Sequence, residues 1–468
     1  MFFIFTLLKK IFNIQNLPQK LSNTYQFDLR AFALFRIVFG FVMLIDLSIR
    51  LSDFKAFYTS QGVLPFEYFS QYFSKYFFIP IYQLNDAPWF VGICFAMQII
   101  AVFCFVIGYR TKLFQVILLV FYISLHMRNP YVLQGGDDLI RVMLLFSLFL
   151  PLNAVWAVQT KPVKYNFAIP ALIFMFQISM VYWVSALMKT SPEWHSEGTA
   201  LYYAFNLDCI QWPLAKYLLQ FPALLQFLTP LVFYLEIVIP ILFFIPFKNN
   251  VFRLICIGIM VVFQIGISAT LFVGLFYLIN LTALIPLLPS SFFNYFKIKE
   301  KKVDWNINHD KFLNYFTSFL LLYVLFWNTN YIPQFKYGLA KRFKSFGFSI
   351  GLNQNWGMFA PSVFKEDGWL IYEAITNQND TIDLKNNRQK AHYEKPENIL
   401  KTVKNDRWRK YTEYIIMQDR TWLREPFHIY ILNQNKDLNI KQLNIIYMVE
   451  LTPAPDGKAT ITKVNLND

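Results

Sequence analysis

One lysine stands where an apolar segment long enough to cross a bilayer comes to its end. Lys189 directly follows the apolar run of residues 167–188, and Trp194 comes five residues later. Two interpretations fit this placement. The lysine can anchor a helix end by extending its ammonium group to the membrane interface. Alternatively, an apolar wall can favour its neutral form, which would make Lys189 a general base for a membrane-soluble substrate.

A second group of polar residues surrounds the glycine pair Gly135-Gly136. Its members are Arg128, Asn129, Asp137, Asp138 and Arg141. The glycines permit a sharp turn, and carboxylates at the start of the following helix suit its positive end. This capping role is sufficient to explain the two aspartates. A binding role requires the side chains to converge on a cavity, and the candidate substrate-binding residues are then Arg128, Asn129, Asp137 and Trp194, beside Lys189 as the catalytic candidate.

The elements that must position these residues are membrane helices. The chain has 468 residues, of which 56% are hydrophobic and 15% are charged, and this is too apolar for a soluble protein of its length. A span needs roughly 20 predominantly apolar residues. We predict nine spans, near residues 32–51, 89–107, 113–125, 139–158, 167–188, 223–247, 251–270, 272–288 and 312–331. The short third span and the weak border between the seventh and the eighth leave eight or ten open.

Basic residues predict the orientation of these spans. Lys and Arg gather before the first and ninth spans and after the second, fourth and sixth. These connections alternate onto one side, which the positive-inside rule assigns to the cytoplasm together with the N-terminus. Residues 1–12 are too short to span and predict an interfacial amphipathic segment. The abundance of Lys, Asn, Ile and Phe suits a bacterial chain, so we expect the inner membrane, with the C-terminal part in the periplasm.

The same composition excludes several classes of function. The net charge of +14 does not indicate nucleic-acid binding, because the basic residues lie mainly in short connections between apolar runs. The four cysteines have no CxxC spacing, and neither a redox site nor a metal site follows from them. No motif of an ATPase, a serine hydrolase or a zinc protease is present. The expected partners are the lipid bilayer and a protein or peptide substrate at the periplasmic face.

The predicted fold class is a mainly α, polytopic helix bundle followed by a small β-rich extramembrane domain. We divide the chain into a cytoplasmic interfacial segment (1–30), a transmembrane domain (31–332) and a periplasmic domain (333–468). Alternating apolar residues predict hairpins at 368–383 and 444–464. The aromatic segment 355–361 and the basic segment 407–411 either pack on the membrane surface or form a lid or docking groove over the transmembrane site.

Polar residues inside the predicted spans favour a cavity or interhelical pairing. They are Arg36, Asp46, Gln177, Glu236, Gln264 and Asn280. Such groups are costly in a bilayer unless they are paired or solvated. We expect Arg36 and Glu236 to neutralise buried partners.

Several short motifs, taken in order, resemble the HTTM family, the bacterial relatives of vitamin K-dependent gamma-glutamyl carboxylase. They are Phe35-Arg-Ile-Val-Phe-Gly40, Phe57-Tyr-Thr-Ser-Gln-Gly-Val-Leu-Pro65, Arg128-Asn-Pro-Tyr, Gly135-Gly-Asp137 and Phe149-Leu-Pro151. The resemblance covers roughly residues 25–295, and the segments 356–361 and 407–411 resemble the tails of bacterial members. It implies nine membrane helices and a β-rich domain on the outer face.

The resemblance also implies a chemistry. In the carboxylase, a lysine deprotonates reduced vitamin K, and oxygen then yields an epoxide and a strong base that removes a glutamate γ-proton before CO2 adds. Lys189 with Trp194 is similar to the setting of that lysine, which implies reduced vitamin K or menaquinol as cofactor and O2 and CO2 as co-substrates. The alternative is a non-carboxylating quinol- or lipid-binding membrane protein. A transporter or assembly factor is a third hypothesis, disfavoured by the absence of an internal repeat.

Overall fold

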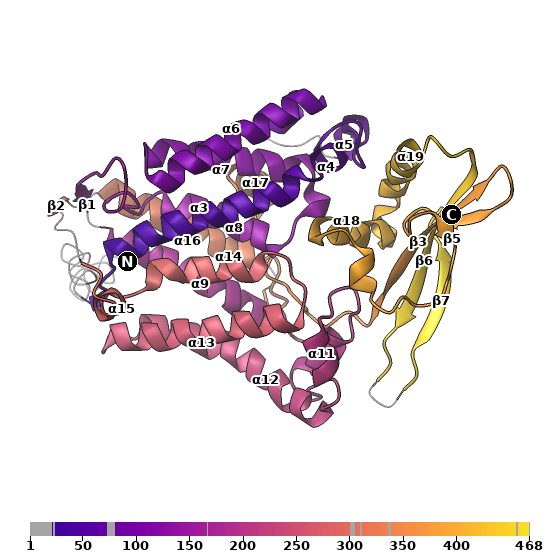
Figure 1. Cartoon of the computed structure of the whole chain (residues 1–468). Coiled ribbons are helices and arrows are strands. Elements are labelled where there is room, and N and C mark those ends of the chain that lie inside the picture. Colours follow the sequence, from indigo (N-terminus) through magenta and orange to yellow (C-terminus); the bar gives the residue numbers. More distant parts are fainter. Residues whose placement is uncertain are drawn as a thin grey trace.

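A computed structural model describes residues 21, 24–72, 80–165, 167–299, 305–308, 311–335, 338–454 and 457–467. Across these residues the chain forms a helical bundle followed by a β-rich domain (Figure 1). The predicted fold class is thus confirmed. The predicted interfacial segment 1–12 lies outside the described residues.

Among the described residues, six helices are long and apolar enough to cross a membrane, judged by length and composition. They are α3 (Leu29–Leu51), α6 (Pro88–Ile107), α7 (Thr111–Arg128), α9 (Ala168–Met188), α12 (Pro222–Val238) with its 3-10 extension η5 (Ile239–Phe244), and α13 (Asn249–Thr270). Further helices pack against them: α8 (Gly135–Ser147), α14 (Phe276–Leu284) with η6 (Ile285–Leu287), and α16 (Lys311–Asn328). Each of the nine predicted segments therefore contains a helix.

One predicted span is wrong in its extent. The segment 139–158 is helical only as far as Ser147, and the rest of it forms turns. Pro151 disfavours helical geometry in the residue before it. The turns are stabilised from the neighbouring helix, because Arg36 donates to the main-chain oxygen of Leu152 at 3.0 Å. Arg36 thus donates to main-chain carbonyls, and the expectation that it neutralises a buried charge is wrong.

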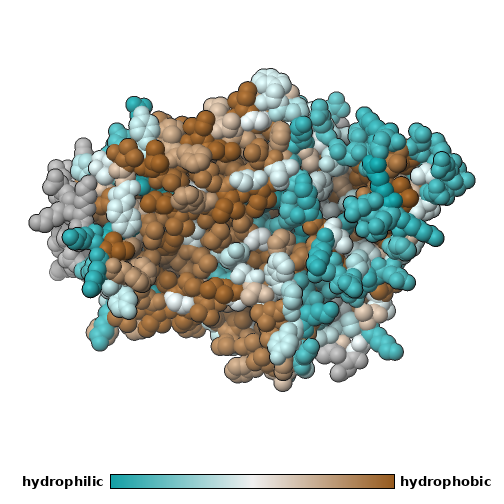
Figure 2. Space-filling model, in the orientation of Figure 1, coloured by the Kyte–Doolittle hydropathy of each residue, from teal (hydrophilic) through white to brown (hydrophobic). Residues whose placement is uncertain are grey.

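On the face that Figure 2 shows, apolar side chains form a broad belt across the bundle, whereas the C-terminal domain has a mainly polar surface. Exposed members of this belt on α6, α12 and α13 include Ile93, Met97, Ile100, Phe103, Leu231, Val262 and Ile265. A contiguous apolar surface of this kind marks contact with lipid or with another protein. Together with the apolar helices, it identifies a multi-pass membrane protein whose partner is the bilayer.

The two ends of the bundle carry different elements. One end carries β1 (Val163–Tyr165), β2 (Trp305–Asn308) and α15 (Ser290–Tyr295) near the start of α3, and the opposite end carries the C-terminal domain (Figure 1). The basic connection between α6 and α7 lies at the first end (Figure 1). The helices therefore alternate as predicted, while the assignment of the first end to the cytoplasm stays a prediction.

Short helices between the spans build the end that faces the C-terminal domain. They are α4 (Phe54–Tyr58), α5 (Phe66–Tyr72), η2 (Ile81–Gln83), η3 (Pro130–Val132), η4 (Pro192–Trp194), α10 (Ala200–Phe205) and α11 (Pro213–Leu218). Of these, η3 contacts the C-terminal domain directly through α18 (Asp406–Ile416).

The C-terminal domain is an antiparallel sheet with helices between its two hairpins. Its strands β3 (Glu366–Thr376), β4 (Thr381–Asp383), β5 (Gln389–Lys390), β6 (Ile440–Leu451) and β7 (Thr460–Asn465) lie in the order β5-β4-β3-β6-β7. The pairings of β3 with β4 and of β6 with β7 confirm both predicted hairpins. Between them lie η7 (Ile399–Thr402), α18, η8 (Gln418–Leu423) and α19 (Arg424–Gln434), while α17 (Lys341–Ile350) precedes the sheet.

The basic segment 407–411 is helical, not extended. It lies in α18, whose start is capped by Asn405: its side-chain oxygen accepts from the main-chain nitrogens of Arg407 and Trp408, both at 3.1 Å. The segment also docks on bundle loops instead of lipid headgroups, since Tyr411 donates to the carbonyl of Val63 at 2.8 Å. The membrane-surface interpretation of this segment is therefore wrong.

Candidate functional site

Lys189 lies at the end of α9, where protein encloses its ammonium group. Its Nζ is 2.5 Å from Oε2 of Glu236 on α12, 3.2 Å from Oγ of Ser185 and 4.6 Å from the centre of the Trp194 ring. The side chains of Lys189 and Glu236 are only 3% and 7% exposed. A lysine that anchors a helix at the interface keeps its ammonium in water, so this interpretation of Lys189 is wrong.

The partner of Lys189 changes what the lysine can do. Glu236 was expected to neutralise a buried partner, and its ion pair with Lys189 confirms this. A desolvated cation is tolerated only with such compensation. Glu236 and Ser185 thus occupy the amine end of Lys189, at 2.5 Å and 3.2 Å from its Nζ.

The loop after Lys189 folds back over the pair. Nε2 of His195 hydrogen-bonds the main-chain oxygen of Lys189 at 2.8 Å, and the His195 ring packs edge-on against Phe233. The indole Nε1 of Trp194 donates to the main-chain oxygen of Phe359 at 2.9 Å. The aromatic segment 355–361 therefore lies against the loop that covers Lys189, which is the placement that the lid interpretation requires.

Two of the predicted binding residues organise a loop instead of facing Lys189. Both terminal nitrogens of Arg128 donate to the carbonyl of Leu64 at 3.0 Å, and Nδ2 of Asn129 donates to the carbonyl of Phe57 at 3.1 Å. These bonds hold the connection between α4 and α5 against the end of α7. Within the described part of the chain, no hydrogen bond or ion pair joins Arg128 or Asn129 to Lys189.

Asp137 belongs to a buried charge network that joins the bundle to the C-terminal domain. We call Asp46, Arg50, Asp137 and Arg407 the junction network. Asp46 accepts from Arg50 Nε at 2.9 Å and from Arg407 Nη2 at 2.7 Å, and Asp137 pairs with both arginines. All four side chains are at most 3% exposed. Two cations and two anions alternate in it, so the network carries no net charge.

The electrostatics of Arg407 follow from this arrangement. Burial and the neighbouring Arg50 lower the pKa of Arg407, but the carboxylates of Asp137 and Asp46 outweigh them and raise it above its ordinary value. The guanidinium is therefore permanently charged and cannot leave its partners without exposing two buried carboxylates.

The remaining residues of the Gly135-Gly136 cluster extend this junction. Oδ2 of Asp137 accepts from the main-chain nitrogen of Gln134 at 2.8 Å, which confirms the capping role. Asp138 pairs with Arg141 and accepts from the main-chain nitrogen of Asn355 at 3.1 Å. The cluster thus fixes the start of α8 and the segment before the sheet, and it does not converge with Lys189.

The bundle that carries these groups matches a known family. The model of the lipase maturation factor transmembrane domain matches residues 30–295, more than half of the chain. The chain belongs to this family. No match to the HTTM family accompanies it. Comparison with curated proteins and comparison with solved structures both give no match.

The lipase maturation factor transmembrane domain supplies three of the four members of the junction network, and Arg407 comes from beyond the matched region. Asp46 was predicted as a polar residue of the first span, whereas Arg50 was not. The spacing of these two was a usable signal, since an aspartate and an arginine four residues apart meet on one helix face. Nothing local in the sequence connects Arg407 to Asp137.

Proposed function

We propose that this protein is a membrane-embedded maturation factor that assists the folding of exported proteins. We place it in the bacterial inner membrane with its C-terminal domain in the periplasm, following the distribution of basic residues. The observation that carries the proposal is the junction network, which fixes the C-terminal domain on a transmembrane domain of the lipase maturation factor family. The family's name describes lipase maturation, and we extend that role to this chain.

The junction favours a scaffold over a flexible tether. A buried ion network holds its elements in one relative orientation, because other orientations leave charges unpaired. The network therefore favours a fixed orientation of the sheet relative to the bundle. Its strand β7 pairs with β6 on one side and is a sheet edge on the other, with Ile461 and Val464 exposed. An edge strand with exposed apolar side chains suits an extended segment of a client chain.

The test is co-expression with an exported lipase, scored as lipase activity per mass of lipase recovered. We expect the intact protein to raise this ratio several-fold and Arg407→Met to lose most of the gain. Lys404→Met is the matched control on the same connection, because Lys404 pairs with Asp53 of the bundle but its side chain is 61% exposed. A ratio that is the same with and without the protein contradicts the proposal.

A second candidate function is supported by the enclosed Lys189–Glu236 pair. In it, the pair transfers a proton from a reduced quinol that enters from the lipid, with the Trp194 ring 4.6 Å from the ammonium. Its fullest form is the carboxylase-like reaction: reduced vitamin K or menaquinol is oxidised by O2 to the epoxide and water while CO2 adds to a glutamate side chain. Its simpler form is binding of a quinol or a lipid without carboxylation.

This candidate has its own test. The protein in nanodiscs is incubated with reduced menaquinone, O2, bicarbonate and glutamate peptides, and quinone epoxide and carboxylated glutamate are measured by mass spectrometry. We expect both products to disappear in Lys189→Met. Lys365→Met is the control, since Lys365 also pairs with a glutamate, Glu193, but is 45% exposed. Quinol binding without either product supports the simpler form, and no binding contradicts both.

A further inference from the structure

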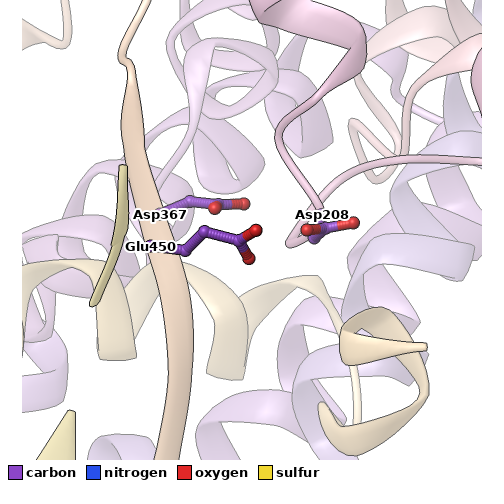
Figure 3. A group of neighbouring side chains, drawn as sticks. All are labelled: Asp208, Asp367 and Glu450. Carbon is purple, nitrogen blue, oxygen red and sulfur yellow. The ribbon is translucent and has the colours of Figure 1, made fainter. Parts of the chain in front are cut away.

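Three carboxylates from distant parts of the chain meet where the sheet touches the bundle. Asp208 lies in the loop between α10 and α11, Asp367 on β3 and Glu450 on β6 (Figure 3). One oxygen from each lies within 4.8 Å of the others. We call these three residues the carboxylate triad. It joins the loop of the transmembrane domain to the C-terminal sheet at a second place, separate from the junction network.

The two members on the sheet are unfavourably placed without a counter-charge. Asp367 and Glu450 are direct partners in the antiparallel register of β3 and β6. Like charges directly opposite each other on neighbouring strands destabilise a sheet. These two are also buried, with 6% and 9% of the residue surface exposed, which strengthens the repulsion. Asp208 adds a third negative charge to them.

One ammonium group compensates only part of this charge. Nζ of Lys395 lies 2.5 Å from Oδ2 of Asp208 and 2.6 Å from Oε2 of Glu450. Burial opposes the charge of Lys395, but the two carboxylates raise its pKa above the ordinary value. Three anions and one cation leave two negative charges. The side chain of Lys395 is 37% exposed, so it has room to turn toward solvent.

Neighbouring cations on α18 do not supply the missing charge. Arg409 pairs with Asp406 and Glu413, and Lys410 pairs with Glu413. These two cations and two anions balance one another. The excess negative charge therefore belongs to the triad itself.

Asp367 also has an unsatisfied oxygen. Its Oδ2 accepts from the main-chain nitrogen of Cys209 at 3.3 Å, while its buried Oδ1 has no hydrogen-bond partner among the described residues. A buried acceptor without a partner is costly. Burial, followed by the neighbouring Asp208 and Glu450, raises the pKa of Asp367 to about 7. The unsatisfied buried oxygen, beside two further carboxylates within 4.8 Å, points to a ligand that binds carboxylate oxygen.

We propose that Asp208, Asp367 and Glu450 bind a divalent cation of the calcium class, which links the transmembrane domain to the C-terminal sheet. Calcium–oxygen distances are about 2.3–2.6 Å, so two ligands of one ion lie at most about 5 Å apart. The spacing within 4.8 Å fits this limit. An all-carboxylate set suits Ca²⁺ or Mg²⁺ better than Zn²⁺, which prefers nitrogen and sulfur. Lys395 turns outward when the cation enters.

The experiment is thermal unfolding of the purified full-length protein in nanodiscs, in EDTA and then with CaCl2 raised to about 1 mM, a range typical of extracellular calcium modules. We expect a saturable increase in the unfolding temperature with Ca²⁺ and a weaker response to Mg²⁺. Asp367→Asn abolishes this response. Its unfolding temperature in EDTA is no lower than that of the wild type, because the substitution removes a repelling charge.

Two further variants separate binding from general ionic effects. Lys395→Met removes the competing ammonium and should lower the Ca²⁺ concentration needed for half of the effect several-fold. Asp437→Asn, on the same domain but with a side chain that is 59% exposed, should respond like the wild type. A wild type that does not respond to Ca²⁺, or an Asp367→Asn variant that responds equally, overturns the proposal.

Discussion

Two of the polar contacts between the C-terminal domain and the bundle, the junction network and the carboxylate triad, differ in their charge balance. In the junction network, Arg50 and Arg407 compensate two aspartates completely, and all four side chains are buried. In the carboxylate triad, one partly exposed lysine, Lys395, pairs with two of the three anions. The first junction is complete within the chain itself. The charge balance of the triad depends on the solution, because protons or a bound cation must supply the missing positive charge.

This difference assigns separate roles to the two contacts. A balanced buried network contributes orientation more than net stability, because pairing little more than offsets desolvation. The stability of an unbalanced cluster depends on solution conditions, because its repulsion is relieved only by protonation or ion binding. We therefore expect Arg407 to fix the orientation of the C-terminal domain. Neutralising the triad should then stabilise the contact between this domain and the bundle.

The largest effect is expected from breaking the balanced junction. Arg407→Met leaves two buried carboxylates with one cation fewer, and loss of one partner from a buried pair costs about 3–5 kcal/mol. Denaturant unfolding, or proteolysis within the C-terminal domain, measures this loss. Lys404→Met is the control with the smaller expected loss, because Lys404 is 61% exposed and its buried partner Asp53 keeps the hydrogen bond from Asn405. Equal stability of the two variants would show that the network does not hold the domain.

The unbalanced junction should respond to pH. The folded-state pKa of Asp367 is raised to about 7, so its favourable contribution is complete at acidic pH and is lost as the pH rises through about 7. In EDTA, we expect the unfolding temperature to fall across this window, by an amount equivalent to a few kcal/mol at most. Asp367→Asn should flatten the profile, and Ca²⁺ should reverse the fall. A wild-type profile that matches Asp367→Asn would exclude this carboxyl as the cause.

The bundle was predictable from the sequence because a bilayer imposes a length and an apolar composition on each span. The exception, residues 139–158, shows the limit of this signal. Its second half is apolar but forms turns, because side chains from neighbouring helices such as Arg36 and Lys112 bind its carbonyls. Composition alone does not distinguish such a buried turn from a helix.

The candidate sites also differ in how far the sequence predicts them, because some of their contacts are local and others join distant residues. Lys189 and Trp194 were predictable as neighbours because they lie five residues apart, and the structure brings them together. Arg407 and Asp137 are separated by 270 residues, and no local pattern connects them. The carboxylate triad was not predictable for the same reason, since each member comes from a different element.

The smallest effect is expected from the cap of α18, and its substitution tests whether this cap positions Arg407 in the network. Asn405 caps this helix through Arg407 and Trp408 and donates to Asp53 at 2.7 Å. Asn405→Ala should cost about 1 kcal/mol, and Asn405→Ser, which keeps a capping oxygen, should cost less. If the cap acts only on helix α18, its cost adds to that of Arg407→Met. If the cap positions the guanidinium, the double variant loses less stability than the sum of the two single variants, because Arg407→Met has already removed the contacts that the cap supports.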